Sequence, residues 1–507
     1  MRAIDRLDPI PVWSDHDVAT TGWEVVDVPL TSVGGGLGSF ALVDTLRIGG
    51  RSTAELAVLS DLNVPSDTYE HLATNSQIPR HERLRSDSGS VIDNIWGWPG
   101  YALREAVADK SVRPAWQAMT EPILTEYFTP RAGQVYASVA RESTRIGWNS
   151  MVRRGVVRTV RKRAEGGYYV LHTPDGDDVP GADGDRRRVA YRSHHVHLAV
   201  GYPGVKMLPD LQRYRTEHND WSRVVNAYEP HDHVYEECRR RPCTVVVRGA
   251  GIVGSRVLQR IIDDHDREGA RTTVVHLFRN YPDGYQGDSP TFRRPARRGW
   301  AYQAFNYPKA AWGGQLRERL DALEGSDRAD LLDEMGGTNT APRRDWREQL
   351  DRGAREGFYR QILGTVRSVE PGDSSSHVRM TVTEPSGAEL RFDADFIIDA
   401  TGLEADIEQH RVLNDLLVHA GAGRNPKGRL DVERDFRIRG TESGTGRMYA
   451  SGSITLGGYY AGVDSFLGLQ YAALRIADSL ADHGFGRRIG TGRSISQWWR
   501  WVRNRPI

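Results

Sequence analysis

Residues 243–264, CTVVVRGAGIVGSRVLQRIIDD, decide the fold. A run of β-branched residues leads into a glycine turn, and apolar residues then recur at helical spacing. The turn places Gly249, Gly251 and Gly254 in a complete G-x-G-x-x-G between strand and helix, which is the context of a dinucleotide-binding site. The first glycine permits the tight turn, the second lets the backbone approach a pyrophosphate, and the third lets the helix pack closely on the strand. We therefore expect a nucleotide-binding unit that begins near residue 243.

The next strand, residues 272–280, indicates which nucleotide this unit binds. It ends in Phe278-Arg279-Asn280 and carries no carboxylate at that end. An acidic residue there would bind a free ribose 2′-hydroxyl, whereas an arginine can pair with a 2′-phosphate. We therefore expect NADPH, with Arg279 at the 2′-phosphate; the alternative is that Arg279 is a solvated surface residue.

A second glycine turn lies upstream, in residues 25–42, VVDVPLTSVGGGLGSFAL. Gly34-x-Gly36-x-Gly38-Ser39 follows a strand and opens a helix, with the small Ser39 at the third position of the motif. This incomplete motif is the weaker of the two signals. The following strand ends at Asp61, which is placed for an adenosine ribose. We assign this site to FAD.

Two further strands end in small residues, LAVGYP at residues 198–203 and DATG at residues 399–402. Small residues are needed where two domains and a cofactor crowd together. The segments are similar to the A-T-G elements at which the chain passes between the FAD and NADPH domains of two-dinucleotide flavoproteins. That similarity makes Thr401 and Gly402 candidate cofactor contacts.

The tail holds a third glycine-rich loop, residues 457–465, before an amphipathic helix. In two-dinucleotide flavoproteins the last helix points its N-terminus at the flavin, where the positive end of the dipole stabilises the reduced anion. Asp464 and Ser465 are therefore candidate flavin contacts. An ordinary N-cap is the other interpretation of this pair, and the two are compatible.

This order of segments predicts an α/β fold with two Rossmann-like dinucleotide-binding domains, the NADPH domain inserted into the FAD domain. The expected boundaries are 1–240 for the first part of the FAD domain, 243–385 for the NADPH domain with a helical insert, and 386–507 for the return segment and last helix. Within them, residues 134–173 are expected to form a small antiparallel sheet and residues 210–242 a linker.

Composition narrows the class of protein. A net charge of +1 over 507 residues gives no sign of a nucleic-acid partner. No apolar run approaches the ~18 residues that span a bilayer, and the first residues do not resemble a signal peptide, so we expect a cytoplasmic protein without a membrane partner.

Cys238 and Cys243 have the C-x4-C spacing of the redox disulfide in glutathione-reductase-like flavoenzymes. There the pair follows the FAD loop, whereas here it precedes the second glycine turn, so we interpret the two cysteines as an incidental pair. The histidines at 194, 195 and 197 are interpreted as structural, and no metal site is expected.

The motifs together resemble the flavin-dependent (class B) monooxygenases, nearest the lysine and ornithine N-hydroxylases of siderophore pathways. Residues 34–41 are similar to that family's G-x-G-P-x-x-L-x-L-A loop, and residues 457–467 to its H-G-L-S-D-T-L-L loop. Residues 75–78 look like its M-Q-I-S segment, which implies that Gln77 lies beside the flavin. Residues 317–340 look like its helix followed by T-N-Y, which implies that Asn339 lies near the nicotinamide ribose.

Three positions depart from the family pattern. Leu37 replaces the proline of the first loop, and Gly468 stands where the family's tail has a serine. Glu82 stands where the family has a lysine that holds the substrate carboxylate. A free α-amino acid is therefore in doubt as the substrate.

The resemblance implies that NADPH reduces FAD, that oxygen adds at flavin C4a, and that the resulting peroxyflavin hydroxylates an amine nitrogen of a small metabolite, as in secondary metabolism. The partners would be that substrate and molecular oxygen, with a homo-oligomer possible. One alternative is an NADPH-dependent flavoprotein dehydrogenase or reductase that does not activate oxygen; another is a non-redox protein that keeps the fold. Four tryptophans have two interpretations, pocket lining or core packing: Trp96, Trp98, Trp300 and Trp312.

Overall fold

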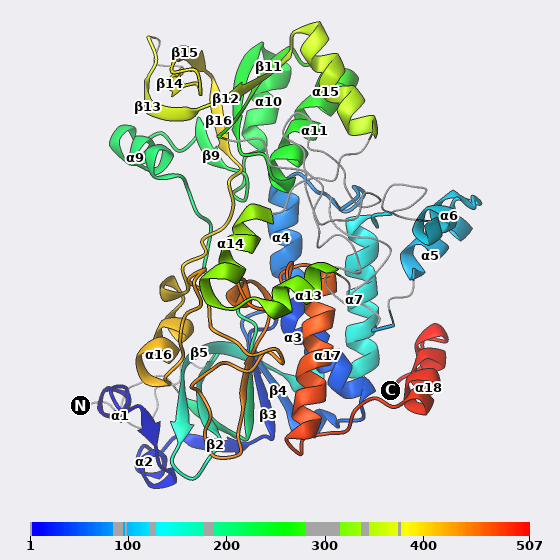
Figure 1. Cartoon of the computed structure of the whole chain (residues 1–507), viewed down its shortest axis with the longest axis vertical. Coiled ribbons are helices and arrows are strands. Elements are labelled where there is room, and N and C mark those ends of the chain that lie inside the picture. The colour runs from blue at the N-terminus through cyan, green and yellow to red at the C-terminus, as the bar shows by residue number, and fades with distance from the viewer. Residues whose placement is uncertain are drawn as a thin grey trace.

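The computed structural model describes residues 3–84, 95–96, 99–120, 128–176, 187–279, 315–335, 344–373 and 377–507. In these ranges the chain forms two units built on separate sheets, one above the other in Figure 1.

The first unit contains a nine-stranded sheet in the order β17-β8-β3-β4-β5-β6-β7-β2, with β1 paired to β5. The strands from β17 to β5 run parallel, and β5, β6 and β7 continue antiparallel. The bounds are β1 Val12–Trp13, β2 Glu24–Asp27, β3 Leu30–Val33, β4 Leu56–Ser60, β5 Val152–Arg163, β6 Tyr168–Pro174, β7 Val189–Ser193, β8 His195–Leu198 and β17 Met448–Ala450.

Alternate residues of these strands enter two cores. Leu30 and Val58 pack on one face with the helices α3 (Leu37–Ile48), α7 (Ala132–Ile146) and α17 (Phe466–Asp482). Val33 and Leu59 pack on the other face with α16 (Arg411–His419). Burial of both faces suits the apolar run of β4, LAVLS, and the buried polar side chains of β3 are hydrogen-bonded to side chains of β7 and β8.

The second unit is a parallel five-stranded sheet, β12-β11-β10-β16-β9. Its strands are β9 Val224–Asn226, β10 Cys243–Arg248, β11 Thr272–Phe278, β12 Tyr359–Leu363 and β16 Phe396–Asp399. Helices α10 (Asp232–Arg240), α11 (Ile252–Glu268) and α15 (Arg344–Glu356) cover one face. Helix α9 (Pro209–His218) and an antiparallel sheet of β13 (Thr365–Pro371), β14 (Val378–Thr383) and β15 (Glu389–Ala394) cover the other.

The nesting predicted from the sequence is confirmed. All strands of the second sheet lie in the chain between β8 and β17, which are neighbours in the first sheet. Further helices include α4 (Asp67–Asn75), α5 (Gly100–Ala108), α6 (Arg113–Thr120), α13 (Gln315–Ala322), α14 (Gly325–Met335) and α18 (Thr491–Val502).

Three local expectations are wrong. Strands β9 and β16 belong to the second sheet, so this unit extends on both sides of the expected range 243–385. Residues 210–242 are not a linker, because they contain most of α9 together with β9 and α10. Residues 134–139 lie in α7 and not in a strand, although β5 and β6 form the antiparallel pair expected after them.

Candidate cofactor site

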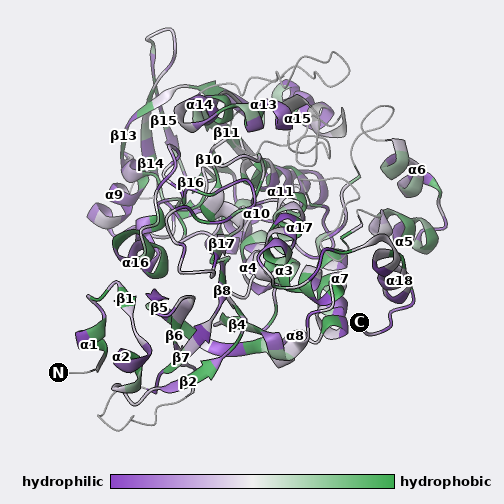
Figure 2. Cartoon of the chain, turned by 60° about the horizontal axis from the view of Figure 1, so that its bottom comes forward, coloured by the Kyte–Doolittle hydropathy of each residue, from purple (hydrophilic) through white to green (hydrophobic). Residues whose placement is uncertain are grey.

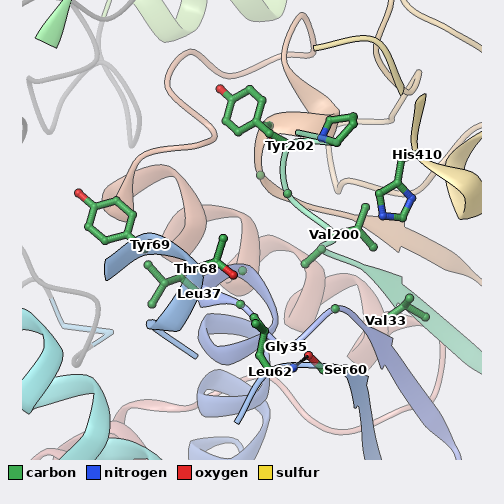
Figure 3. Close-up of a pocket in the computed structure, with 18 of the residues that line it drawn as sticks. Val33, Gly35, Leu37, Ser60, Leu62, Thr68, Tyr69, Val200, Tyr202 and His410 are labelled. Carbon is green, nitrogen blue, oxygen red and sulfur yellow. Dashed lines mark hydrogen bonds between the residues drawn. The ribbon is translucent and has the colours of Figure 1, made fainter. Parts of the chain in front are cut away.

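A cavity of about 680 Å³ lies at the carboxyl ends of β3 and β4 in the first unit. Its lining includes the glycine turn at residues 34–38, the end of β4 at residues 60–62, the crossover at residues 199–205 and the loop before α17. This is the edge of a parallel sheet where α/β proteins bind their ligands. In Figure 3, Leu37, Thr68 and Tyr69 lie on one side of the cavity, and Val200 and His410 on the other.

The glycines of the first turn have distinct roles. Gly34 has a φ of +95°, and an added Cβ would lie 2.4 Å from the carbonyl oxygen of Ala199. A Cβ on Gly35 would lie 2.2 Å from the Ser60 hydroxyl, whereas one on Gly36 would meet nothing within 4 Å. Gly36 is also the N-cap of α3, so its open side faces the positive end of that helix. The turn therefore offers backbone N–H groups and free space for a phosphate.

A buried chain of hydrogen bonds holds the turn from behind. The Ser39 hydroxyl donates to the Gly34 carbonyl, and the Ser32 hydroxyl donates to Ser39 over 2.8 Å. His197 joins Ser32 through Nδ1 and Ser451 through Nε2, both at 2.9 Å. Burial lowers the pKa of His197 to about 3, so the imidazole is neutral and carries one proton. Since Ser32 already donates to Ser39, that proton belongs on Nδ1, and Ser451 donates to Nε2.

The loop before α17 lines another part of the cavity. Ser465 is the N-cap of this helix, where its hydroxyl accepts from the Gly468 N–H at 3.0 Å. Asp464 accepts a hydrogen bond of 2.8 Å from the Tyr202 hydroxyl. Burial and the Asp464 carboxylate both raise the pKa of Tyr202, which therefore stays protonated as the donor. An added Cβ on Gly468 would lie 2.0 Å from the Gly462 carbonyl oxygen, which explains why no serine stands there.

The second glycine turn has the same construction. Gly249 has a φ of +121°, and an added Cβ would lie 2.6 Å from the carbonyl oxygen of Ala400. A Cβ on Gly254 would lie 2.5 Å from the Gly249 carbonyl oxygen, so the third glycine is required for close packing. Gly251 is the N-cap of α11. Each glycine turn is therefore backed by a small-residue crossover, Ala199 for the first and Ala400 for the second.

A buried arginine connects the two units. Arg256 of α11 donates through Nε and Nη2 to the carbonyl oxygen of Gln77, at 3.1 and 2.8 Å. Gln77 has a φ of +63°, and its side-chain amide donates to the Asn75 carbonyl at 3.0 Å. Glu82 lies 3.4 Å from the guanidinium of Arg256. Desolvation lowers the pKa of Arg256, and two acceptor atoms of the first unit contact its guanidinium, the Gln77 carbonyl oxygen and a Glu82 carboxylate oxygen.

The structure separates the predicted site residues into groups. Those that line the cavity are Gly34, Gly36, Gly38, Asp61, Asp464 and Ser465. Those at the second turn are Gly249, Gly251, Gly254, Thr401 and Gly402. Ser39 lies behind the first turn, and Arg279 is exposed at the end of β11.

Of the two residues expected to act on the reaction, one can be placed. Gln77 is buried and does not line the cavity, whereas Asn339 lies outside the described residues. Tyr202, Tyr69 and His410, which do line the cavity, were not singled out from the sequence. The G-Y-P of the crossover was the one available signal, for Tyr202.

Other expectations can be followed in the described ranges. Cys238 and Cys243 are both free thiols that are buried and lie next to each other. Trp96 packs against Trp501, while Trp98, Trp300 and Trp312 lie outside the described residues. Among described residues no cluster of three metal-ligating side chains occurs. None of the described helices is both long and apolar enough to cross a bilayer.

Comparisons with known proteins support the fold. Neither a family model nor a curated protein sequence matches the chain. Among solved structures, ornithine hydroxylase PvdA from Pseudomonas aeruginosa is 18% identical with a TM-score of 0.60, over 90% of this chain and 100% of that one. Ornithine N-hydroxylase KtzI from Kutzneria sp. 744 is 14% identical with a TM-score of 0.64, over 90% and 100%. The cadaverine monooxygenase DfoA from Erwinia amylovora is 12% identical with a TM-score of 0.61, over 93% and 96%.

At these identities the comparisons establish a shared fold. The chain has the architecture of the N-hydroxylating flavoproteins along nearly its whole length. The fold class predicted from the sequence, and its resemblance to this group, are confirmed at that level.

Proposed function

We propose that this chain is an FAD- and NADPH-dependent monooxygenase that hydroxylates an amine nitrogen of a small metabolite. One observation carries the proposal: two glycine turns, each backed by a small-residue crossover, are nested in the fold of ornithine and cadaverine hydroxylases. A second dinucleotide site would have no use in a protein that kept FAD only as a structural element.

The cavity fits FAD. Gly36 and the N-terminus of α3 would hold the pyrophosphate, and Asp61 is placed for the adenosine ribose. Asp464, Ser465 and the N-terminus of α17 would face the flavin ring. When bound, the reduced flavin supplies the electrons that activate oxygen. The chain's own part is to position both nucleotides, exclude water and supply oriented dipoles, which requires no protein nucleophile.

The second turn would bind NADPH. Gly249, Gly251 and the N-terminus of α11 would hold the pyrophosphate, and the exposed Arg279 is accessible to a 2′-phosphate. Arg256 holds this unit against the first one through Gln77. We propose that Asn339 contacts the nicotinamide ribose, as the resemblance implies.

We propose an amine without a free carboxylate as the substrate class. Glu82 stands where the resemblance implies a cation for a carboxylate, and it is paired with Arg256. Glu82 therefore offers no positive charge to a substrate carboxylate. Of the solved relatives, the cadaverine monooxygenase is named for a diamine, which has no carboxylate.

Rapid mixing tests the reaction class. The enzyme is reduced with NADPH, mixed with oxygen with and without a panel of ornithine, lysine, cadaverine and putrescine, and assayed for hydroxylamine and hydrogen peroxide. We expect product from the diamines, with little from the amino acids. Oxidation of NADPH only with a non-oxygen acceptor would instead establish the reductase alternative.

A further inference from the structure

Helix α18 (Thr491–Val502) has two apolar faces, and the first of them docks it on the protein. Trp501 is 6% exposed, and its ring lies 6.0 Å from that of Trp96. The Trp96 Nε1–H donates to the Ser494 hydroxyl at 2.7 Å, and Gln497 is buried on the same side. The inner face of α18 is therefore accounted for by packing within the chain.

The other apolar face is turned outward. Ile495, Trp499 and Val502 are 55%, 49% and 49% exposed, and they recur at i, i+4 and i+7. This spacing places them in one line along the helix, which we call the outer stripe. Packing within the described chain does not explain the outer stripe.

The segment that carries the outer stripe is rich in arginine. The segment 484–507 carries six arginines and no aspartate or glutamate, in a chain whose net charge is only +1. The guanidinium of Arg503 lies 5.5 Å from the ring centroid of Trp499. All six are exposed, although Arg488 is paired with Asp482 and Arg493 donates to the Ile48 carbonyl: Arg487, Arg488, Arg493, Arg500, Arg503 and Arg505.

Further exposed apolar side chains lie on the same side of the molecule. In and just before α6, Val112, Trp116 and Met119 are 84%, 57% and 77% exposed. Helices α5, α6 and α18 are drawn on the same side in both Figure 1 and Figure 2. Two groups of exposed apolar side chains therefore lie on this side of the molecule, the outer stripe and those of α6.

We propose that α18 binds the surface of an anionic lipid bilayer. The outer stripe would enter the boundary between head groups and acyl chains, with the arginines at the lipid phosphates. Tryptophan and arginine are both suited to this depth, because each combines an apolar body with a polar tip. A helix of 12 residues is too short to span the bilayer, so the absence of a spanning helix does not bear on this surface contact.

Charge and side-chain type favour lipid over other occupants. A second copy of the chain meeting α18 symmetrically would bring the same six arginines to the contact, which like-charge repulsion disfavours. Against a phosphate backbone the aliphatic Ile495 and Val502 would stay in contact with water, whereas acyl chains would bury them. This surface is remote from the proposed chemistry, and its lipid binding does not depend on that function.

Vesicle flotation with the full-length holoprotein tests the proposal. Vesicles of phosphatidylcholine alone are compared with vesicles that also contain phosphatidylglycerol, at low and high salt. The stripe variant is Ile495→Ser/Trp499→Ser/Val502→Ser, and the charge variant is Arg500→Glu/Arg503→Glu. Trp221→Ser is the matched control, because Trp221 is 50% exposed in the second unit. Flavin content and the thermal unfolding midpoint verify the fold, since no variant touches the inner face.

We expect wild type and Trp221→Ser to float with the anionic vesicles only, with binding that weakens as salt rises. Each of the other two variants should lose roughly tenfold or more in affinity. Three results would overturn the proposal. One is no preference for anionic vesicles, and another is undiminished flotation of the stripe variant. The third is a wild-type dimer, measured by light scattering, that the stripe variant converts to monomer.

Discussion

Gly36 is the position in the first glycine turn where an added side chain finds open space, and its φ of −79° suits any residue. Gly36→Ala should therefore fold normally but lose part of its FAD affinity, because its Cβ enters the space left for the pyrophosphate. Gly36→Glu places a carboxylate at the proposed pyrophosphate position, and like charges in contact should weaken FAD binding by about a hundredfold or more. Fluorescence titration of the apoprotein measures both. Gly36→Gln is the isosteric control, and equal loss in Gln and Glu variants would contradict the electrostatic argument.

Arg279 is exposed at the end of β11, where it can reach a 2′-phosphate. Arg279→Ala should raise the KM for NADPH about 10- to 150-fold, because a charge-assisted contact contributes about 1.5–3 kcal/mol. The KM for NADH should hardly change. Arg267→Ala, at an exposed arginine near the end of α11, serves as the control. An equal effect of Arg279→Ala on both nucleotides would show that this side chain does not bind the phosphate.

At the residue scale the sequence predicts backbone requirements better than side-chain contacts. Gly34, Gly249 and Gly254 could be identified because each lies where a Cβ would collide with the chain's own backbone. Such a requirement is local and appears in the spacing of glycines. The hydrogen bond between Tyr202 and Asp464 joins residues 262 positions apart in the sequence, and no local sequence pattern predicts it.

At the scale of elements, helices α13 and α14 dock on the loop before α17. Tyr459 of that loop is 2% exposed and lies between two guanidinium groups, Arg328 at 3.6 Å and Arg434 at 4.4 Å from its ring centroid. Its hydroxyl donates to Glu324 at 2.8 Å and accepts from Arg439 at 2.9 Å. Arg328 also donates to the Leu320 and Leu323 carbonyls at the end of α13.

Tyr459 should therefore anchor the two helices through its ring. Tyr459→Leu removes both cation–π contacts and leaves a cavity, which should lower the free energy of unfolding by about 2–5 kcal/mol. Tyr459→Phe keeps the ring and should lose much less. Hydrogen exchange measured by mass spectrometry should quicken in α13 and α14 of the Leu variant while β10 and β11 stay protected. Unchanged exchange in these helices would mean that other contacts hold them.

Strands and helices were predicted correctly where the hydrophobic periodicity and the turn residues agreed, as in β3–α3 and β10–α11. The failures have physical causes. Residues 134–139, QVYASV, alternate over a few positions like a strand, but Ala132–Ile146 buries one helical face that a six-residue window does not show. Residues 210–242 are polar because α9 and α10 are surface helices that each bury only three residues.

At the scale of the whole molecule, the nested order of segments was visible because each unit repeats the same strand–turn–helix pattern. How the two units face one another was not visible. Their contact through Arg256 depends on one buried guanidinium and a backbone carbonyl at a left-handed residue. Neither the guanidinium nor the carbonyl has a sequence signature. The sequence pointed to Gln77 for its side chain only, and it did not point to Arg256.

Arg256 therefore supports a prediction about the whole enzyme. Its helix begins at the proposed NADPH phosphate site, and its guanidinium ends on the Gln77 carbonyl of the first unit. Arg256→Ala should leave the Gln77 carbonyl unpaired and let the second unit shift. Because a displacement of about 1 Å between reacting atoms can cost about a hundredfold in rate, reduction of the flavin by NADPH should slow by up to that factor. Stopped-flow absorbance of the flavin measures the rate.

The control separates this coupling from a general loss of structure. In Arg256→Ala, FAD content and reduction by dithionite should match wild type, because neither requires the second unit to be in place. Glu82→Gln removes only the 3.4 Å ionic contact and leaves both bonds to the Gln77 carbonyl, so its reduction rate should fall threefold at most, about what a partly exposed ion pair contributes. If Arg256→Ala reduced its flavin at the wild-type rate, the two units would be held in register by contacts other than this arginine. If Glu82→Gln were as slow as Arg256→Ala, the ion pair and not the carbonyl would be the coupling element.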